Sequence, residues 1–349
     1  MRETAVVDRP LLTTDVTRAV TALRTGGLVG LPTETVYGLA ADADDVRAVT
    51  RVFAVKGRPA DHPLIVHLAG PQALGDWARD VPRYARRLAE ELWPGPLTLV
   101  LRRAPRAGDH VTGGQETVGL RAPAHPVAHQ VLLDSGLALA APSANRFGKV
   151  SPTTAAHVLT ELGEVLDPSR DLILDGGRCD VGVESTILDC TAEAPVLLRP
   201  GAVDSETVRR VGGVAVVERP SEVRAPGTLS SHYAPRARVV LARDAEAATA
   251  MLAPLDGLLA PADVVTPAGV VRLSAPSDAV EYARALYAAL READVLGLRR
   301  VVAVPPPGTG LALAVTDRLS RASTPATAPN HRKAAAQSAV VNTLSHSDE

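Results

Sequence analysis

The feature that most restricts the fold of this 349-residue chain is a polar cluster directly after each of several short apolar runs. The cluster 32–38 follows the run 28–31, and the cluster 142–145 follows the run 138–141. Arg121 ends a run of its own. Short buried strands that alternate with helices are typical of α/β proteins, in which ligands bind outside the carboxyl ends of strands. We therefore expect these clusters to converge on one site.

The spacing of apolar residues predicts the other elements of the N-terminal part. We expect one helix from about Asp15 and another from Asp44 that ends before Gly57. Ser151 and Pro152 predict a third helix start, with serine as N-cap and proline in the first turn. The predicted strands are 28–31, 64–68, 97–101, 117–121, 138–141, 184–190 and 196–199.

A second, smaller α/β unit is predicted after a linker. Periodicity disappears between about residues 219 and 238, where prolines accumulate. Beyond it we expect strands at 239–242, near Val271 and at 301–304, a helix at 277–293, and a last helix ending near Ala322. The expected domains are 1–218, a linker at 219–237, a small domain at 238–322, and a disordered tail at 323–349.

Composition excludes several classes of protein. A net charge of −2 and a content of 2 Trp, 5 Tyr and 2 Phe argue against a protein whose main task is to grip RNA or DNA. Cys179 and Cys190 cannot form a disulfide framework or complete a four-ligand zinc site. Segment 1–12 lacks the apolar stretch of a secretory signal, and no run is long enough to span a membrane. A cytoplasmic protein is expected.

The common nucleotide and metal motifs are missing from the sequence. It contains neither GxxxxGK[ST] nor a complete GxGxxG after a strand. His125 and His129 have HxxxH spacing without an adjacent glutamate, so we interpret them as helix-surface or core histidines, and we predict no metal site. No serine or cysteine is visibly coupled to a histidine, which makes covalent catalysis a poor candidate.

The clusters nevertheless share one chemistry. Lys56, Arg58, Arg121 and Arg199 supply positive charge, and the Ser, Thr and Asn residues beside them supply neutral hydrogen-bonding groups. This combination suits a ligand with several anionic groups, such as a triphosphate plus a carboxylate. For any one cluster alone, a solvated surface charge or a helix cap explains the same residues equally well.

Taken in order, the motifs resemble a known family. The series PTETVYGL, KGRP, PLIVH, WPGPLTLVL, TVGLR, PSAN, SPT, ESTI and RPG is similar to that of the YrdC-domain family. Residues 226–227 and 232–235 resemble its long two-domain branch, the threonylcarbamoyl-AMP synthases. The resemblance covers roughly residues 12 to 322. It implies an open, twisted mixed-sheet YrdC-like domain, a linker, and a smaller Rossmann-like α/β domain.

The resemblance also implies a reaction. L-threonine, bicarbonate or CO2, and ATP would give threonylcarbamoyl-AMP and diphosphate, with Mg²⁺ bound largely through ATP and water. The product would pass to a downstream tRNA threonylcarbamoyl transferase, and direct binding of tRNA by this chain is expected to be weak or absent.

Site residues are carried over from the family's motifs. The resemblance implies a catalytic signature of Lys56, Arg58, Ser143 and Asn145. The residues implied for threonine are Thr35, His67, Arg121, Ala141 and Ser185. Those implied for the nucleotide are Arg58, His62, Thr117, Ser143, Ser151, Arg199, His232 and Tyr233. His62 is a departure, because the family often has asparagine there.

Several alternatives remain open at this stage. The same domain could transfer a carbamoyl group to another acceptor, or serve as a non-enzymatic RNA-binding module. No general base is obvious; His67 is a candidate, although holding the threonine hydroxyl is its preferred role. We predict that segment 221–235 folds across the nucleotide site as a lid, against the alternative of a passive tether.

Overall fold

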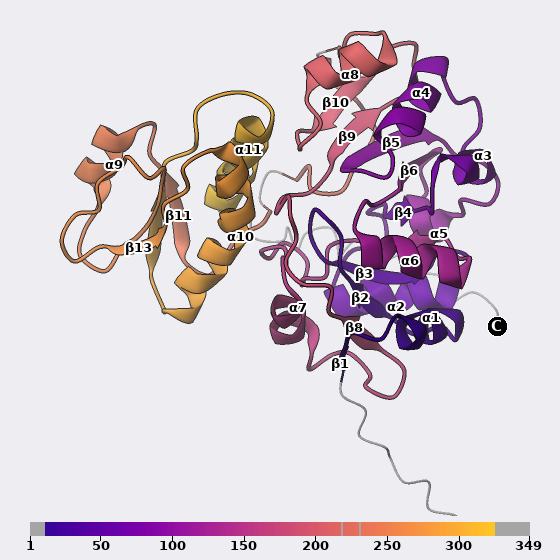
Figure 1. The fold of residues 1–349 in the computed structure, drawn as a ribbon, viewed down its shortest axis with the longest axis horizontal. Coiled ribbons are helices and arrows are strands. Elements are labelled where there is room, and N and C mark those ends of the chain that lie inside the picture. Colours follow the sequence, from indigo (N-terminus) through magenta and orange to yellow (C-terminus); the bar gives the residue numbers. More distant parts are fainter. Residues whose placement is uncertain (1–10, 218, 230–231, 325–349) are drawn as a thin grey trace, which may run out of the picture.

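Two separate β-sheets form the framework of the molecule (Figure 1). The computed structural model describes residues 11–217, 219–229 and 232–324. The segment considered for a secretory signal, up to residue 10, and the predicted tail from residue 325 onward lie outside the described residues. One sheet is large and mixed, and the other is small and parallel. The predicted fold class is confirmed.

The large sheet has ten strands, and its mixed pairing brings several strand ends to one edge. In spatial order the strands are β1 (Leu12–Thr13), β8 (Leu172–Leu174), β2 (Val29–Leu31), β3 (Gly38–Asp42), β7 (Leu139–Ala140), β4 (Ile65–His67), β6 (Thr117–Arg121), β5 (Leu97–Arg102), β9 (Thr186–Asp189) and β10 (Val196–Arg199). Strands β4 and β6 are parallel, with His67 opposite Arg121. Both side chains therefore belong to the same end of the sheet.

Helices cover both faces of this sheet. Helices α1 (Val16–Arg24) and α6 (Pro126–Ser135) pack on one face, and α2 (Val46–Lys56) and α7 (Ala155–Leu162) on the other. Side chains alternate between the two faces along β3. Ala40 packs in the core on the side of α1 and α6, and Leu39 and Ala41 pack in the core on the side of α2 and α7. The remaining helical elements of this unit are η1 (Pro71–Ala73), α3 (Leu74–Trp77), α4 (Arg83–Leu92), α5 (Asp109–Thr112) and α8 (Ser205–Gly212).

The helix limits follow from local chemistry, with one correction. Asp15 and Asp45 cap α1 and α2 through their carboxylates, close to the predicted starts. The helix start predicted at Ser151 and Pro152 is wrong, because α7 begins at Ala155 with Thr154 as its N-cap. The Ser151 hydroxyl instead donates to a buried carboxylate described below.

The small sheet has four parallel strands, β11 (Arg238–Leu241), β14 (Arg300–Ala303), β12 (Gly257–Leu259) and β13 (Val271–Ser274), in that order. Helix α9 (Ala245–Met251) packs on one face. Helices α10 (Ala279–Val295) and α11 (Leu311–Ser323) pack on the other, which faces the large sheet (Figure 1). The predicted smaller Rossmann-like unit is therefore present.

The two units share apolar contacts. Val36, Val150 and Val183 of the first unit belong to the same buried cluster as residues of α10 and α11. Gly182, with φ of 82°, lies so close to α10 that an added Cβ would stand 2.5 Å from the carbonyl oxygen of Ala283. The second unit is therefore packed directly against the segment that leads into β9.

Candidate active site

The polar clusters converge on one cleft at the strand ends. Loops after β2, β7 and α2 contribute walls, and β4, β6 and β10 contribute their last residues. The predicted residues that line it are Thr35, Arg58, His67, Arg121, Ala141, Ser143, Ser185, Arg199, His232 and Tyr233. The cleft also contains Thr33, Val36 and Glu184, which belong to the polar clusters of the sequence but were not assigned a role in the site.

Arg121 occupies a charge-balanced end of the cleft. Its Nη2 donates to Glu34 Oε1 at 2.6 Å, and its Nη1 donates to Thr35 Oγ1 at 2.9 Å. The other Glu34 oxygen accepts from the backbone N–H of Ala124 at 3.0 Å. Both charged side chains are almost fully buried. The pairing of Glu34 with Arg121 was not predicted; its only signal is the place of Glu34 within the motif PTETVYGL.

His67 lies beside Arg121 as a neutral imidazole. Its Nδ1 is 3.3 Å from the carbonyl oxygen of Ile65. Burial, followed by the charge of Arg121, lowers the pKa of His67 to about 3. A group with this pKa is a weak proton acceptor near neutral pH, so His67 is suited to hydrogen bonding rather than to general-base work.

Arg58 and Arg199 form a cationic end. The acceptors that the described residues offer them are neutral oxygens: the carbonyls of Pro63, Ser185 and Pro226, and the hydroxyl of Ser185. Arg58 Nε is buried without a partner in the described structure. Burial lowers the pKa of Arg58 to about 10, which still leaves it charged near neutral pH. This end of the cleft suits an anionic ligand.

Lys56 and Asn145 lie behind the cleft wall rather than in it. The Lys56 Nζ donates to the backbone carbonyls of Ser143 and Asn145. Burial, followed by the charge of Arg58, lowers the pKa of Lys56 well below its usual range. Lys56 therefore fixes the 143–145 loop, a structural contact that the sequence did not indicate.

Three predicted nucleotide residues lie outside the cleft lining. His62 packs edge-on against Phe147, with ring centroids 5.3 Å apart. Thr117 begins β6, four residues from Arg121 and hence about 13 Å away along the strand. Ser151 reaches the site through a hydrogen bond from its Oγ to Glu184 Oε1, at 2.6 Å.

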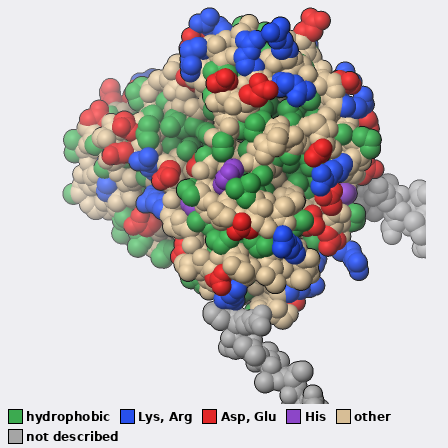
Figure 2. Space-filling view, turned by 45° about the vertical axis from the view of Figure 1, so that its right-hand side comes forward, with side chains coloured by type: hydrophobic (Ala, Val, Ile, Leu, Met, Phe, Trp, Pro, Cys, Tyr) green, Lys and Arg blue, Asp and Glu red, His purple; other side chains and the backbone are tan. Residues whose placement is uncertain are grey.

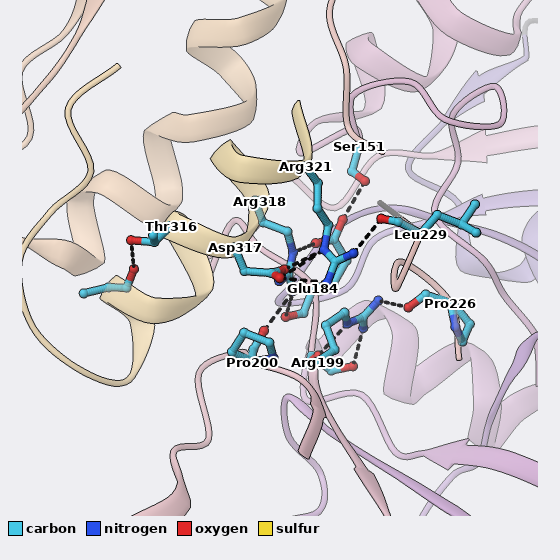
Figure 3. A network of polar contacts seen from close by, with 12 residues as sticks. Ser151, Glu184, Arg199, Pro200, Pro226, Leu229, Thr316, Asp317, Arg318 and Arg321 are labelled. Atoms are coloured by element: carbon cyan, nitrogen blue, oxygen red, sulfur yellow. Dashed lines mark hydrogen bonds and ion pairs between the residues drawn. The ribbon is translucent and has the colours of Figure 1, made fainter. Parts of the chain in front are cut away.

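Glu184 joins the two units of the protein (Figure 3). Its Oε2 accepts from Arg318 Nε of α11 at 2.8 Å and from the Tyr287 hydroxyl of α10 at 2.8 Å. Burial by itself would raise the pKa of Glu184; the charges of Arg318 and then Arg199 outweigh it and lower the pKa to about 2. The carboxylate is therefore ionised, paired and fully hydrogen-bonded.

The linker closes one side of the cleft. Gly227 has φ of 78°, and a Cβ there would stand 2.2 Å from Tyr233 Oη. Tyr233 itself has φ of 61°, which is unusual for a residue with a side chain. The His232 Nδ1 and the Tyr233 hydroxyl are buried and lack hydrogen-bond partners in the described residues. Such orphaned groups are suited to a bound ligand.

The described part of the chain offers neither a metal centre nor a membrane-spanning helix. It holds no group of three or more His, Cys, Asp and Glu that could bind a metal ion. None of its helices is both long and apolar enough to cross a membrane. His125 caps α6 by accepting from the backbone N–H of Val127, and His129 is partly buried on the same helix.

Both units of the chain are similar to known proteins. Residues 21–201 match a family model described as "Telomere recombination", and residues 203–324 match one described as "Threonylcarbamoyl-AMP synthase, C-terminal domain". The chain is 40% identical over 318 residues to the threonylcarbamoyl-AMP synthase of Pyrococcus abyssi. The aligned region covers 86% of this chain and 92% of the relative. It is 38% identical over 324 residues to the Bacillus subtilis enzyme of the same name, covering 88% and 92%.

A solved structure is similar over nearly the same length. The crystal structure of P. abyssi Sua5 complexed with L-threonine matches with a TM-score of 0.78 and 39% identity, over 88% of this chain and 94% of that one. The arrangement of both units is therefore shared with that protein.

The buried histidines predict how stability depends on pH. The pKa of His67 and that of His232 are both lowered to about 3, mainly by burial, against about 6.5 in an unfolded chain. Between these values the unfolded chain binds protons that the folded chain does not, so stability is complete above about pH 6.5 and falls as pH decreases.

At pH 5 each histidine should cost about 2 kcal/mol of unfolding free energy. We expect a double variant, His67→Gln with His232→Gln, to lose less stability than the wild type between pH 7 and pH 5. Urea midpoints and slopes measured at both pH values test this. Equal losses in the two proteins would contradict it.

Proposed function

The chain belongs to the threonylcarbamoyl-AMP synthase family, and from this premise we propose how its cleft performs the reaction. The protein is an ATP-using nucleotidyltransferase that makes threonylcarbamoyl-AMP for the N6-threonylcarbamoyladenosine modification of tRNA. The observation that carries the proposal is the division of one cleft into a charge-balanced end and a cationic end.

The charge-balanced end is the proposed threonine site. An amino acid is a zwitterion, and the Arg121–Glu34 pair offers one charge of each sign. Thr35 and neutral His67 provide partners for a hydroxyl, and Ser185 and Ala141 complete the wall. Arginine is well suited to a carboxylate because its planar fork can donate two parallel hydrogen bonds.

The cationic end is the proposed nucleotide site. Arg58, Arg199 and Ser143 line it directly, and His232 and Tyr233 cover it from the linker. Ser151, Thr117 and His62 lie outside the lining and would act at the margins of the nucleotide. Lys56 and Asn145 would act by shaping the loop that carries Ser143.

The reaction requires two bond-forming steps. The threonine amine attacks CO2, forming an N–C bond as one C=O π bond opens to a carboxylate oxygen, and the released nitrogen proton passes to solvent, which gives a carbamate. A carbamate oxygen then bonds to the α-phosphorus of ATP while the bond to the leaving diphosphate breaks. Arg58 and Arg199 would stabilise negative charge on the phosphates, and Arg121 would orient threonine. Because its low pKa keeps His67 neutral and makes it a weak base, this side chain would accept or donate a hydrogen bond to the substrate hydroxyl rather than remove a proton.

The residues present fit a Mg²⁺ ion held mainly by ATP. Asn145 Oδ1 is buried and has no hydrogen-bond partner in the described residues, so one orphaned amide oxygen stands behind the cleft wall, two residues from Ser143 of the lining. Mg²⁺ commonly keeps several waters and binds through substrate phosphates, so a cage of carboxylates is not required. When bound, the ion would neutralise phosphate charge.

We further propose the domain limits 1–218, 219–237 and 238–322, a cytoplasmic location, and transfer of the product to a separate tRNA-modifying transferase. Weak direct binding of tRNA is supported by the net charge of −2 and by the intermixed acidic and basic side chains in Figure 2. A non-enzymatic RNA-binding module is therefore not favoured. A carbamoyltransferase is not favoured either, because the C-terminal unit matches the synthases.

Product formation tests the function directly. Incubation of the protein with ATP, bicarbonate and isotope-labelled threonine should yield labelled threonylcarbamoyl-AMP and diphosphate, detected by mass spectrometry. Omission of bicarbonate is the control and should abolish the product. Hydrolysis of ATP without incorporation of the label would argue against the assignment.

Removing Arg121 tests the threonine site. A charge-assisted bidentate contact contributes about 1.5–3 kcal/mol, so Arg121→Ala should weaken threonine binding roughly 10- to 150-fold and affect ATP much less. Because the change leaves Glu34 buried without its partner, the double variant Arg121→Met with Glu34→Gln is the matched control for folding. Calorimetric titration of threonine provides the measurement, and unchanged affinity would refute the role.

The linker is proposed to act as a lid over the cleft during turnover. The support is that Pro226, Gly227, His232 and Tyr233 line the cleft, and that Pro226 accepts a hydrogen bond from Arg199. A lid would keep water from the acyl-adenylate product.

Limited proteolysis separates a lid from a tether. Cleavage near Thr228 and Leu229 should be slower when ATP and threonine are both present than when either is absent. Cleavage in the 261–266 loop of the small unit, which is remote from the cleft lining, serves as the internal control. Equal rates near Thr228 with and without both ligands would leave the segment as a tether.

A further inference from the structure

Arg318 is a fully buried cation that the proposed mechanism does not use. Its side chain is 0% exposed, although it belongs to α11 of the small unit. Its Nε donates to Glu184 Oε2 at 2.8 Å, and its Nη2 donates to the carbonyl oxygen of Pro200 at 3.0 Å. Its Nη1 donates to Asp317 at 2.6 Å. Figure 3 shows that the contacts with Glu184 and Pro200 cross from α11 to the first unit, whereas Asp317 lies on α11 itself.

Glu184 stands between two buried arginines. Its carboxylate pairs with Arg318, and the next residue, Ser185, accepts hydrogen bonds from Arg199 through its carbonyl and its hydroxyl. Among the described residues the recorded partners of Arg199 are neutral oxygens, so its positive charge is not neutralised by contact. The same Arg199 lines the cleft.

Because Glu184 lies near Arg199, the pairing of Glu184 with Arg318 affects how Arg199 can bind an anionic ligand. A buried carboxylate without a partner is costly, and it takes the nearest cation or a proton. After Arg318, the strongest attraction on Glu184 comes from Arg199. If Arg318 were missing, Glu184 would compete with an anionic ligand for Arg199.

We propose that Arg318 is a positioning residue for the nucleotide end of the cleft, because by occupying Glu184 it keeps Arg199 available to phosphate groups and fixes the hydroxyl of Ser151. The proposal rests on the proposed function, since it takes ATP as the ligand of Arg199. Through Arg318, the small unit would therefore influence the electrostatics of the cleft in the large unit.

The groups that face Glu184 define how a variant should respond to pH. They are Arg318 on α11, Tyr287 on α10, Arg199 on β10, and His232 and Tyr233 in the linker; Asp317 pairs with Arg318. With Arg318 present, Glu184 stays ionised and paired throughout the neutral range. Without it, protonation of Glu184 at lower pH would remove the competition for Arg199.

The test measures steady-state kinetics of threonylcarbamoyl-AMP formation by the full-length protein. Arg318→Met should raise the KM for ATP about 10-fold or more and leave the KM for threonine unchanged. Relative to the wild type measured at the same pH, its KM for ATP should fall as the pH is lowered from about 8 to about 6, because the terminal phosphate of ATP titrates equally in both proteins. Glu184→Gln added to Arg318→Met should restore most of the affinity for ATP.

A matched control separates positioning from general destabilisation. Arg300 pairs with Asp256 within the small unit, away from the cleft, so Arg300→Met removes an arginine from a more exposed ion pair without touching the cleft. It should lower the melting temperature and leave the KM for ATP unchanged. If Arg318→Met does not fold, Arg318→Lys keeps the charge with poorer geometry and should show a smaller rise in KM and a smaller dependence on pH.

The outcomes are distinct. A raised KM for ATP with rescue by the double variant supports the proposal. An unchanged KM for ATP in a folded Arg318 variant, or equal rises in the KM values for ATP and threonine, overturns it. Absence of product from the wild type would overturn the proposed function instead.

Discussion

Burial of positive charge is the constraint around which this protein is arranged. Five basic side chains, those of Lys56, Arg58, Arg121, Arg199 and Arg318, are each at most 9% exposed. Water solvates none of them well, so each requires a carboxylate or several oxygens from the protein. Glu34 pairs with Arg121, and Glu184 pairs with Arg318. The other three side chains donate hydrogen bonds to backbone carbonyls. The strand ends and the linker must lie where they do to supply these oxygens.

The strand ends and several helix limits could be predicted from the sequence, because each depends on residues that are close together along the chain. Short apolar runs with polar residues directly after them indicate strand ends, and Arg121 and His67 meet for that reason. The caps of α1 and α2 are also local, since an aspartate and the next turn suffice to define them. The roles of these residues toward substrates stay predictions.

The rest depends on contacts between distant residues. Nothing near Glu34 in the sequence shows that it meets Arg121, 87 residues later, because that contact depends on the strand order that brings β6 close to β3 through β7 and β4. Strand β3 itself, with the sequence GLAAD, lacks the β-branched residues that mark strands. The helix start at Ser151 failed because a tertiary partner, Glu184, accepts from the hydroxyl that would have capped the helix.

The distance along the chain between Glu184 and Arg318 also matters for synthesis. The two residues are 134 positions apart, which corresponds to roughly ten seconds of translation. The strands of the large sheet emerge from the ribosome long before α11, so for this interval the nascent chain carries Glu184 without its partner Arg318. Helix α11 is the last described element of the protein. The cationic end of the cleft therefore reaches its final charge balance only after α11 has been synthesised.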